Sequence, residues 1–179
     1  MRQDNSLAHM DKSIVRVVAT GGTIDEDNSD PATGKSLFTH SRVPEMLRDA
    51  GIASSVTFEV LLLKDSSDIT EEERKQILER CLSCPEKRIV ITHGTNEMIG
   101  TAAVLGRNIS NKIVVFVGAF IPYAKEGSDA ISNLKYAVEQ ARELSPGVYI
   151  AMNGRVFPWD DVRKNKKKQV FENLEKTVE

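Results

Sequence analysis

Two short peptides in this chain combine threonine with glycine in a way that could support nucleophilic chemistry. The sequences TGGT (residues 20–23) and HGTN (residues 93–96) each follow directly on a run of apolar residues. A threonine hydroxyl becomes an effective nucleophile when a neighbouring base or cation helps to remove its proton, and the oxyanion it creates needs N–H donors. Glycines leave such backbone donors accessible. We therefore expect Thr23 to be the first candidate nucleophile and Thr95 to lie near it.

The apolar pattern predicts the elements that must position these two threonines. Five runs are too evenly apolar to be half-exposed strands, which favours a parallel sheet covered on both faces. The predicted strands are residues 14–19, 56–63, 88–92, 112–117 and 148–152, and the predicted helices are residues 43–49, 70–82, 96–105 and 128–144. A Thr70/Glu73 capping box opens the second of these helices. Strands that alternate with helices indicate βαβ units, so we predict an α/β fold.

Polar residues gather at the carboxyl ends of the first four predicted strands, which is where parallel α/β sheets bind ligands. The four peptides are residues 20–23, 64–68, 93–96 and 118–122. Helices starting after Asp68 and Thr95 would add positive dipole ends suited to a carboxylate. Each peptide also has a structural interpretation, as a turn or a helix cap. The polar stretch at residues 25–39 is either a lid over the site or a solvated hairpin.

The composition limits the classes of partner. The chain has 179 residues, enough for one domain with its own core. Its 24 basic and 26 acidic residues give a net charge of −2, which supplies no general attraction for nucleic acid or membranes. No apolar run approaches the roughly 20 residues of a membrane-spanning helix. Residues 1–10 resemble a tag or leader, so we expect a cytoplasmic protein with a single domain at residues 11–179.

Three further groups of residues are expected to be structural. Cys81 and Cys84 fall at the end of a predicted helix, where the helix dipole disfavours a thiolate, so they are interpreted as buried thiols. His93 has no companion ligand at coordination spacing and is interpreted as a packed residue, so no metal is implied. The lysine-rich run at residues 164–168 is typical of a solvated face.

Six motifs, taken in order, resemble the amino-terminal domain of bacterial-type L-asparaginases over residues 14–172. They are ATGGTI at 19–24, DSSDIT at 65–70, ITHGT at 91–95, VGA at 117–119 with Ile121-Pro122, SDA at 128–130 with Asn133-Leu134, and Asp161-Val162 ahead of Lys164. The resemblance implies a three-layer flavodoxin-like (Rossmann-like) parallel sheet with helices on both faces. It also implies hydrolysis of a side-chain amide through a threonine acyl-enzyme, without a cofactor.

The resemblance assigns roles to particular residues. Thr23 matches the nucleophile on a mobile loop, and Thr95 matches a second threonine that works in a relay with Lys164. This match puts the solvated-face interpretation of Lys164 in doubt. The positions matched to substrate binding are Gly22, Ser66, Ser67, Thr95 and Asn96. Among these, the two serines match the segment that holds the substrate α-carboxylate, and the backbone of Gly22 and Thr95 is expected to contact the oxyanion.

Three departures from the family pattern bear on activity. Asn96 stands where the family has an aspartate of the relay, which removes a charge that would hold both the substrate ammonium and Lys164. Residues 25–39 contain no tyrosine, although the family loop carries one that assists the nucleophile. The sequence ends at Glu179, whereas family members continue into a carboxyl-terminal domain that is absent here.

These features lead to two hypotheses. The first is an asparaginase-like amidohydrolase that releases ammonia from a small-molecule amide other than plain L-asparagine. The second is a binding module that kept the fold and the carboxylate-holding loops but lost catalysis. The chain is also open to interpretation as a fragment of a two-domain protein, and a homo-oligomer is compatible with the family resemblance.

Overall fold

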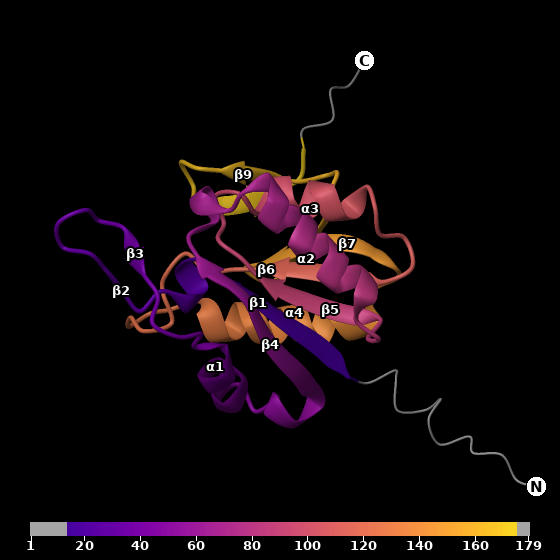
Figure 1. The fold of residues 1–179 in the computed structure, drawn as a ribbon, viewed down its shortest axis with the longest axis horizontal. Helices are drawn as coiled ribbons and strands as arrows, with labels where there is room; N and C mark the ends of the chain where they lie inside the picture. The colour runs from indigo at the N-terminus through magenta and orange to yellow at the C-terminus, as the bar shows by residue number, and fades with distance from the viewer. Residues whose placement is uncertain (1–13, 175–179) are drawn as a thin grey trace, which may run out of the picture.

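The computed structural model describes residues 14–174 and contains a six-stranded sheet with helices on both faces (Figure 1). The predicted leader at residues 1–10 lies outside the described residues. Five strands are parallel, and their bounds are β1 Val15–Gly21, β4 Val56–Lys64, β5 Arg88–Thr92, β6 Ile113–Val117 and β7 Gly147–Met152. Their order across the sheet is β4-β1-β5-β6-β7, which is the doubly wound, flavodoxin-like arrangement. The predicted fold class is therefore confirmed.

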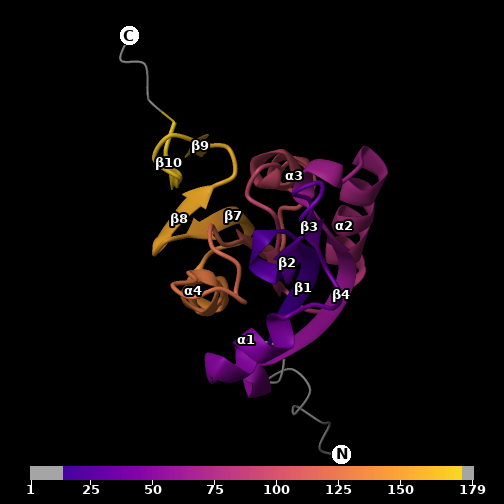
Figure 2. The ribbon, with the colours of Figure 1, turned by 90° about the vertical axis from the view of Figure 1, so that its left-hand side faces the viewer.

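The sixth strand, β8 (Arg155–Pro158), was not predicted and runs antiparallel to β7 at the sheet edge. A tight turn joins the two strands. Its central residues, Asn153 and Gly154, both have positive φ angles, of 51° and 73°. Asparagine followed by glycine is the preferred pair for this kind of hairpin turn, because both residues tolerate the left-handed region. The hairpin redirects the chain toward the carboxyl ends of the parallel strands (Figure 2).

Alternating side chains of the strands form two cores, one on each face of the sheet. Helices α1 (Val43–Asp49) and α4 (Ala130–Glu143) cover one face, and α2 (Glu71–Ser83) and α3 (Met98–Gly106) cover the other (Figure 2). In β6, Val115 packs with the first pair of helices, while Phe116 packs with the second. This burial on both faces explains why the parallel strands are uniformly apolar.

Helix α2 illustrates how local sequence sets an element's bounds. Its predicted capping box is present, since the Glu73 amide donates to Thr70 Oγ1 at 3.2 Å and the Thr70 amide donates to Glu73 Oε2 at 2.8 Å. At the other end, the buried ammonium of Lys112 donates to the carbonyls of Leu82 and Cys84. The last carbonyls of the helix thereby gain a cationic partner.

The two cysteines are free and buried, as predicted. Cys81 and Cys84 pack in the core beneath α2 and α3. Burial raises the pKa of the Cys81 thiol to about 12, so this group stays protonated at neutral pH.

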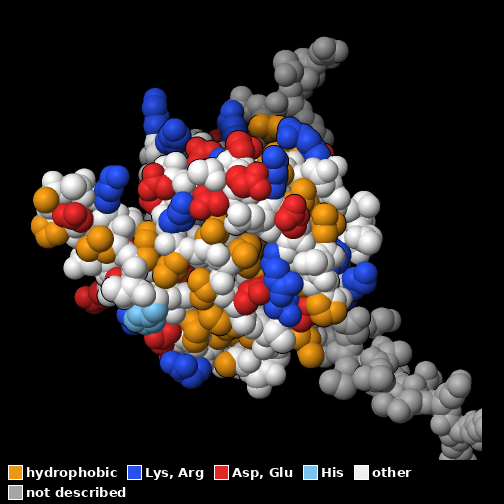
Figure 3. All heavy atoms as spheres, in the orientation of Figure 1, with side chains coloured by type: hydrophobic (Ala, Val, Ile, Leu, Met, Phe, Trp, Pro, Cys, Tyr) orange, Lys and Arg blue, Asp and Glu red, His pale blue; other side chains and the backbone are white. Residues whose placement is uncertain are grey.

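Two small hairpins stand outside the main sheet. Strands β2 (Asn28–Ser29) and β3 (Ser36–Leu37) form the first, within the predicted polar stretch, and Figure 3 shows it projecting from the body of the molecule. Strands β9 (Arg163–Asn165) and β10 (Val170–Glu172) form the second. No helix within residues 14–174 is long and apolar enough to cross a bilayer.

Candidate active site

The carboxyl ends of three neighbouring strands interlock through glycine. Gly22, after β1, has a φ angle of 84°, and a Cβ atom there would overlap the backbone of Gly94, after β5. A Cβ atom on Gly94 would in turn overlap the Ser66 side chain, after β4. The Thr20 hydroxyl adds a buried hydrogen bond of 2.6 Å to the carbonyl of Thr92. Only residues without side chains allow these three peptides to approach so closely.

A cavity of about 170 Å³ opens where these strand ends meet. Its lining residues are Thr23, Asp65, Ser66, Gly94, Thr95, Asn96, Ala119, Phe120, Lys164 and Gln169. The structure thus brings the four predicted catalytic residues to one cavity, together with one of the two predicted carboxylate-binding serines.

Lys164 makes the most direct contacts within this cavity. Its Nζ atom donates to Thr95 Oγ1 and to Asn96 Oδ1, both at 2.8 Å. The expectation that the whole lysine-rich run is a solvated face is therefore wrong for Lys164, whereas Lys166 is exposed. Burial of the Lys164 ammonium, together with the charge of Lys166, lowers the pKa of this amine below its ordinary value.

The contact with Lys164 fixes what Asn96 can offer a ligand. An ammonium group only donates hydrogen bonds, so the contacted atom of Asn96 is its oxygen. The Nδ2 group is left, and it is a donor. An aspartate at this position would present a second acceptor instead, so Asn96 changes the polarity of the group available to a ligand as well as its charge.

Thr23 and Thr95 differ in their surroundings. Thr95 is 7% exposed and is held by Lys164. Thr23 is half-buried at the start of a 3₁₀ turn, η2 (Thr23–Asp25), and lines the cavity. Asp25 anchors this turn, because its buried carboxylate accepts from Ser41 Oγ at 2.8 Å and from the Arg42 amide at 2.6 Å.

One predicted oxyanion donor is already engaged. The Gly22 amide donates to the carbonyl of Lys64 at 2.9 Å, so it does not point an unused N–H group into the cavity. The backbone role expected for Gly22 is corrected accordingly. Gly22 instead allows the ends of β1 and β5 to approach, while the residues that line the cavity there are Thr23 and Thr95.

The two serines after β4 lie on different sides of their peptide. Ser66 is 1% exposed and lines the cavity with Thr23, while Ser67 is exposed and lines a separate cavity under the β2–β3 hairpin. They belong to a 3₁₀ turn, η4 (Ser66–Asp68), that begins with a hydrogen bond of 2.8 Å from the Ser67 amide to Asp65 Oδ1. Because of this turn, α2 begins only at Glu71, and not directly after the serine peptide.

Helix α3 also begins later than predicted. Its first residue is Met98, and Glu97 precedes it without a side-chain cap. Thr95 and Asn96 therefore lie in the turn ahead of the helix. Within that turn, the Glu97 amide donates to Ser66 Oγ at 3.4 Å, which links the peptide after β5 to the one after β4.

Sequence reasoning missed the residues that hold the fourth strand end. The Asp129 carboxylate accepts from the amides of Phe120 and Ile121, both at 3.0 Å, and Asn133 Nδ2 donates to the carbonyl of Gly118 at 3.0 Å. Asn133 Nδ2 also donates to Asp129 Oδ2 at 2.9 Å. The motif SDA with Asn133 contained the signal, although its role was visible only in three dimensions. It positions the peptide that carries Phe120 into the cavity.

Phe120 connects this peptide to the hairpin that carries Lys164. Its ring lies 6.2 Å, between centroids, from that of Phe171, which pairs with Lys164 across the β9–β10 hairpin. The Lys164 ammonium is 5.7 Å from the Phe120 ring centroid, within the range of a cation–π contact. An aromatic face thus supports the amine in addition to its contacts with Thr95 and Asn96.

His93 is a packed residue, as predicted. Its Nδ1 atom lies 2.8 Å from the carbonyl of Gly94, and its ring meets Phe116 edge to face at 5.7 Å. Burial lowers the pKa of His93 to about 4, so its imidazole is neutral at physiological pH.

Comparison with known proteins decides the family. Residues 14–175 match the family model described as "Asparaginase, N-terminal". The chain belongs to the asparaginase family. Two curated relatives show the range of this asparaginase family: an L-asparaginase of Thermococcus kodakarensis, 32% identical over 150 residues, and a glutamyl-tRNA(Gln) amidotransferase subunit of Methanococcus vannielii, 32% identical over 152 residues.

These matches cover 79% of the chain, but only 44% of the L-asparaginase and 34% of the amidotransferase subunit. The chain thus spans less than half the length of these asparaginase-family relatives. Solved structures agree on the fold. The thermostable L-asparaginase from Thermococcus kodakarensis superposes with a TM-score of 0.76 at 27% identity, covering 90% of this chain and 51% of that one. A probable cytoplasmic L-asparaginase from Campylobacter jejuni gives 0.75 at 26% identity, covering 90% and 53%.

Proposed function

We propose that this asparaginase-family chain is an amidohydrolase that converts a small-molecule carboxamide into a carboxylate and ammonia through a threonine acyl-enzyme. One observation carries the proposal. The Lys164 amine contacts Thr95 Oγ1 inside the cavity that Thr23 also lines. A hydroxyl, an amine with a lowered pKa and a second hydroxyl in one small cavity form the set that activates an oxygen nucleophile.

The reaction has two stages. Thr23 Oγ bonds to the carboxamide carbon, and its proton passes through Thr95 Oγ1 to the neutral amine of Lys164. The relay returns that proton to the amide nitrogen, the carbon–nitrogen bond breaks, and ammonia leaves an ester on Thr23. Water then adds to the ester carbon and gives a proton to the same relay, which returns it to the departing Thr23 oxygen. One water is consumed, and one carboxylic acid and one ammonia are formed.

The remaining cavity residues bind and stabilise. The oxyanion takes N–H donors from the backbone of Thr95 and of Thr23 itself, since the Gly22 amide is engaged elsewhere. A substrate carboxylate is held at Ser66, whose buried hydroxyl lines the cavity. The donor group of Asn96 cannot bind an ammonium, so the substrate lacks a free α-amino group or carries it acylated.

The cellular setting belongs to the same proposal. We place the protein in the cytoplasm, in keeping with the Campylobacter jejuni structure described as a probable cytoplasmic enzyme. Its partner is a small-molecule amide, and self-association is compatible with the family.

An ammonia-release assay over a panel of amides tests the proposal. We expect turnover of at least one amide by the wild-type chain, its abolition in Thr23→Ala, and its retention in Thr33→Ala, which removes an exposed threonine of the neighbouring hairpin. The rival hypothesis, a binding module, rests on Asn96 and on the loop without tyrosine. Thermal stabilisation by amides or carboxylates without any ammonia release would favour that module and refute the enzyme.

A further inference from the structure

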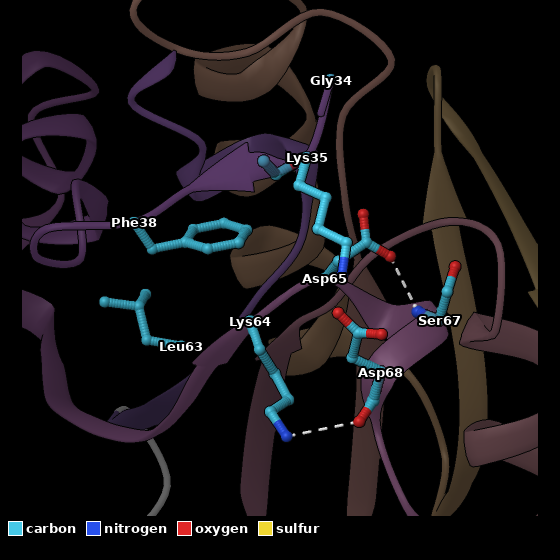
Figure 4. A pocket seen from close by; sticks show the side chains of 9 residues that line it. Gly34, Lys35, Phe38, Leu63, Lys64, Asp65, Ser67 and Asp68 are labelled. Carbon is cyan, nitrogen blue, oxygen red and sulfur yellow. Dashed lines mark hydrogen bonds between the residues drawn. The ribbon is translucent and has the colours of Figure 1, made fainter. Parts of the chain in front are cut away.

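A second cavity, of about 380 Å³, lies between the β2–β3 hairpin and the end of β4 (Figure 4). Its lining residues are Gly34, Lys35, Ser36, Phe38, Leu63, Lys64, Asp65, Ser67 and Asp68. Small-molecule sites in proteins occupy roughly 300–1,000 Å³. The second cavity falls within this range, whereas the cavity of about 170 Å³ that holds the threonines has room for little more than an amide and its nearest substituents.

The two cavities adjoin. Asp65 lines both of them, and the consecutive residues Ser66 and Ser67 line the first and the second respectively. The 3₁₀ turn η4 therefore forms the wall between the cavities. Because Ser67 has a small side chain, this wall leaves space on the side of the second cavity. A ligand seated against Ser66 can extend past Asp65 without any change in the fold.

The second cavity has an apolar side and a polar side. Figure 4 shows the Phe38 ring and the Leu63 side chain together on one side, with Lys35 reaching from the hairpin toward Asp65. The charge of Lys64 is already balanced, because its ammonium lies 2.8 Å from Glu73 Oε1 and donates to the carbonyl of Asp68 at 3.3 Å. An apolar group is therefore accommodated beside Phe38 and Leu63 without displacing a charge pair.

The hairpin that supplies Phe38 is anchored at its base. Asp27 accepts from both the amide and the hydroxyl of Thr39, at 2.7 and 2.6 Å, and its carboxylate lies 3.4 Å from the Arg42 guanidinium. The Asp27 amide donates to the carbonyl of Leu37 at 3.0 Å. The second cavity is thus bounded by a braced hairpin.

Asn96 determines what kind of group joins the two cavities. Its Nδ2 group donates a hydrogen bond, so it suits a carbonyl oxygen and gives nothing to an ammonium. An acylated α-nitrogen carries such a carbonyl, is uncharged, and ends in a chain that needs space. The second cavity provides that space.

We infer that the substrate is an N-acylated amino-acid amide, with its carboxamide in the cavity lined by Thr23 and Thr95 and an apolar acyl group in the second cavity against Phe38 and Leu63. This inference rests on the proposed amidohydrolase function. The bonds made and broken are those of the proposed reaction, and the acyl group takes no part in them. It contributes binding energy through the apolar surface it buries.

The test compares ammonia release from L-asparagine, N-acetyl-L-asparagine and N-hexanoyl-L-asparagine. We expect kcat/KM to be lowest for L-asparagine and at least about tenfold higher for the hexanoyl compound than for the acetyl compound, as buried methylenes provide. Phe38→Ala should remove most of the hexanoyl advantage while leaving N-acetyl-L-asparagine within about twofold of wild type. Leu37→Ala is the matched control, because Leu37 is the exposed neighbour on the same hairpin and does not line the cavity.

The outcomes separate the two proposals. Ammonia release with equal kcat/KM for the acetyl and hexanoyl compounds, or an equal loss in Phe38→Ala and Leu37→Ala, overturns the acyl site and leaves the hydrolase standing. Preference for L-asparagine itself also overturns it, and would identify the Asp65 carboxylate as a partner for the ammonium. No ammonia from any amide, in a chain that thermal melting shows to be folded, refutes the proposed function.

Discussion

The ends of β1 and β5 carry the same kinds of residue and play different parts. After β5, Thr95 is almost fully buried and is bonded to an amine from a distant hairpin. After β1, Thr23 is half-buried at the cavity, in a turn fixed mainly through Asp25. The difference teaches that similar peptides at two strand ends can be divided between handling a proton and presenting an oxygen atom. A single threonine cannot be tightly bonded to the amine and also be free to attack.

The contrast predicts its largest effect for the threonine that attacks. Thr23→Ala should lower kcat by about 10³-fold or more, because losing a nucleophile removes the covalent route altogether. Thr95→Ala should slow acylation but still allow an adduct to form. Intact-protein mass spectrometry after an acid quench measures the adduct. A wild-type adduct located on Thr95 by peptide mapping would reverse the roles assigned here.

A second prediction concerns the amine that distinguishes the β5 end. Lys164→Met should lower kcat by about 10²- to 10⁴-fold, the usual contribution of a general base. Since the neutral amine is the active form, the wild-type rate should rise with pH through the lowered pKa of Lys164. This acidic limb should disappear from the kcat profile of Lys164→Met.

Lys166→Gln is the matched variant for that profile. It keeps the Lys164 amine but removes the neighbouring positive charge, which raises the pKa of Lys164 toward its ordinary value. The acidic limb should therefore move to higher pH, with the plateau rate unchanged. A profile that ignores both substitutions would mean that another group sets the pH dependence.

A third substitution sharpens the contrast by restoring a charge. Asn96→Asp gives Lys164 a counter-charge, which favours the ammonium and raises its pKa, so the acidic limb should again shift to higher pH. It also gives a substrate ammonium an acceptor, and kcat/KM for L-asparagine should rise by about tenfold or more, in line with the strength of charge-assisted hydrogen bonds. Unchanged use of L-asparagine would show that Asn96 is not the residue that sets specificity.

The smallest expected effect concerns the bond between the two ends. Thr20→Val removes the hydrogen bond to the Thr92 carbonyl and should lower the free energy of unfolding by about 1–3 kcal/mol, because it leaves a buried acceptor without its partner. Thr20→Ser keeps the hydroxyl and serves as the control. Urea unfolding of the three proteins measures the difference. Equal stability of the valine and serine variants would show that glycine contacts alone hold the ends together.

Much of the framework was predictable because each long apolar strand is buried on both faces. The capping box at Thr70 and Glu73 specified the start of α2 in the same way, since its signal lies within four consecutive residues. Strand β8 was missed because it is short and half-exposed, so its sequence lacks the even apolar run of the parallel strands.

The candidate site was predictable only in part. Both threonines are marked by neighbouring glycines. Lys164 is not, because it lies in a lysine-rich run, and its contact with Thr95 spans 69 positions in the chain. Only its resemblance to a family motif pointed to it. The engagement of the Gly22 amide and the assignment of Ser66 and Ser67 to different cavities depend on the backbone path, which no pattern of residue types specifies.

The amine of Lys164 comes from β9, which follows every parallel strand in the chain. Ribosomes release proteins from the amino terminus onward, and earlier segments can fold first. A nascent chain that has emerged as far as β7 already contains both threonines and the strands that carry them, with no base beside the hydroxyls. Reactivity toward amides is thereby withheld during synthesis until the final hairpin is made and docks on Phe120.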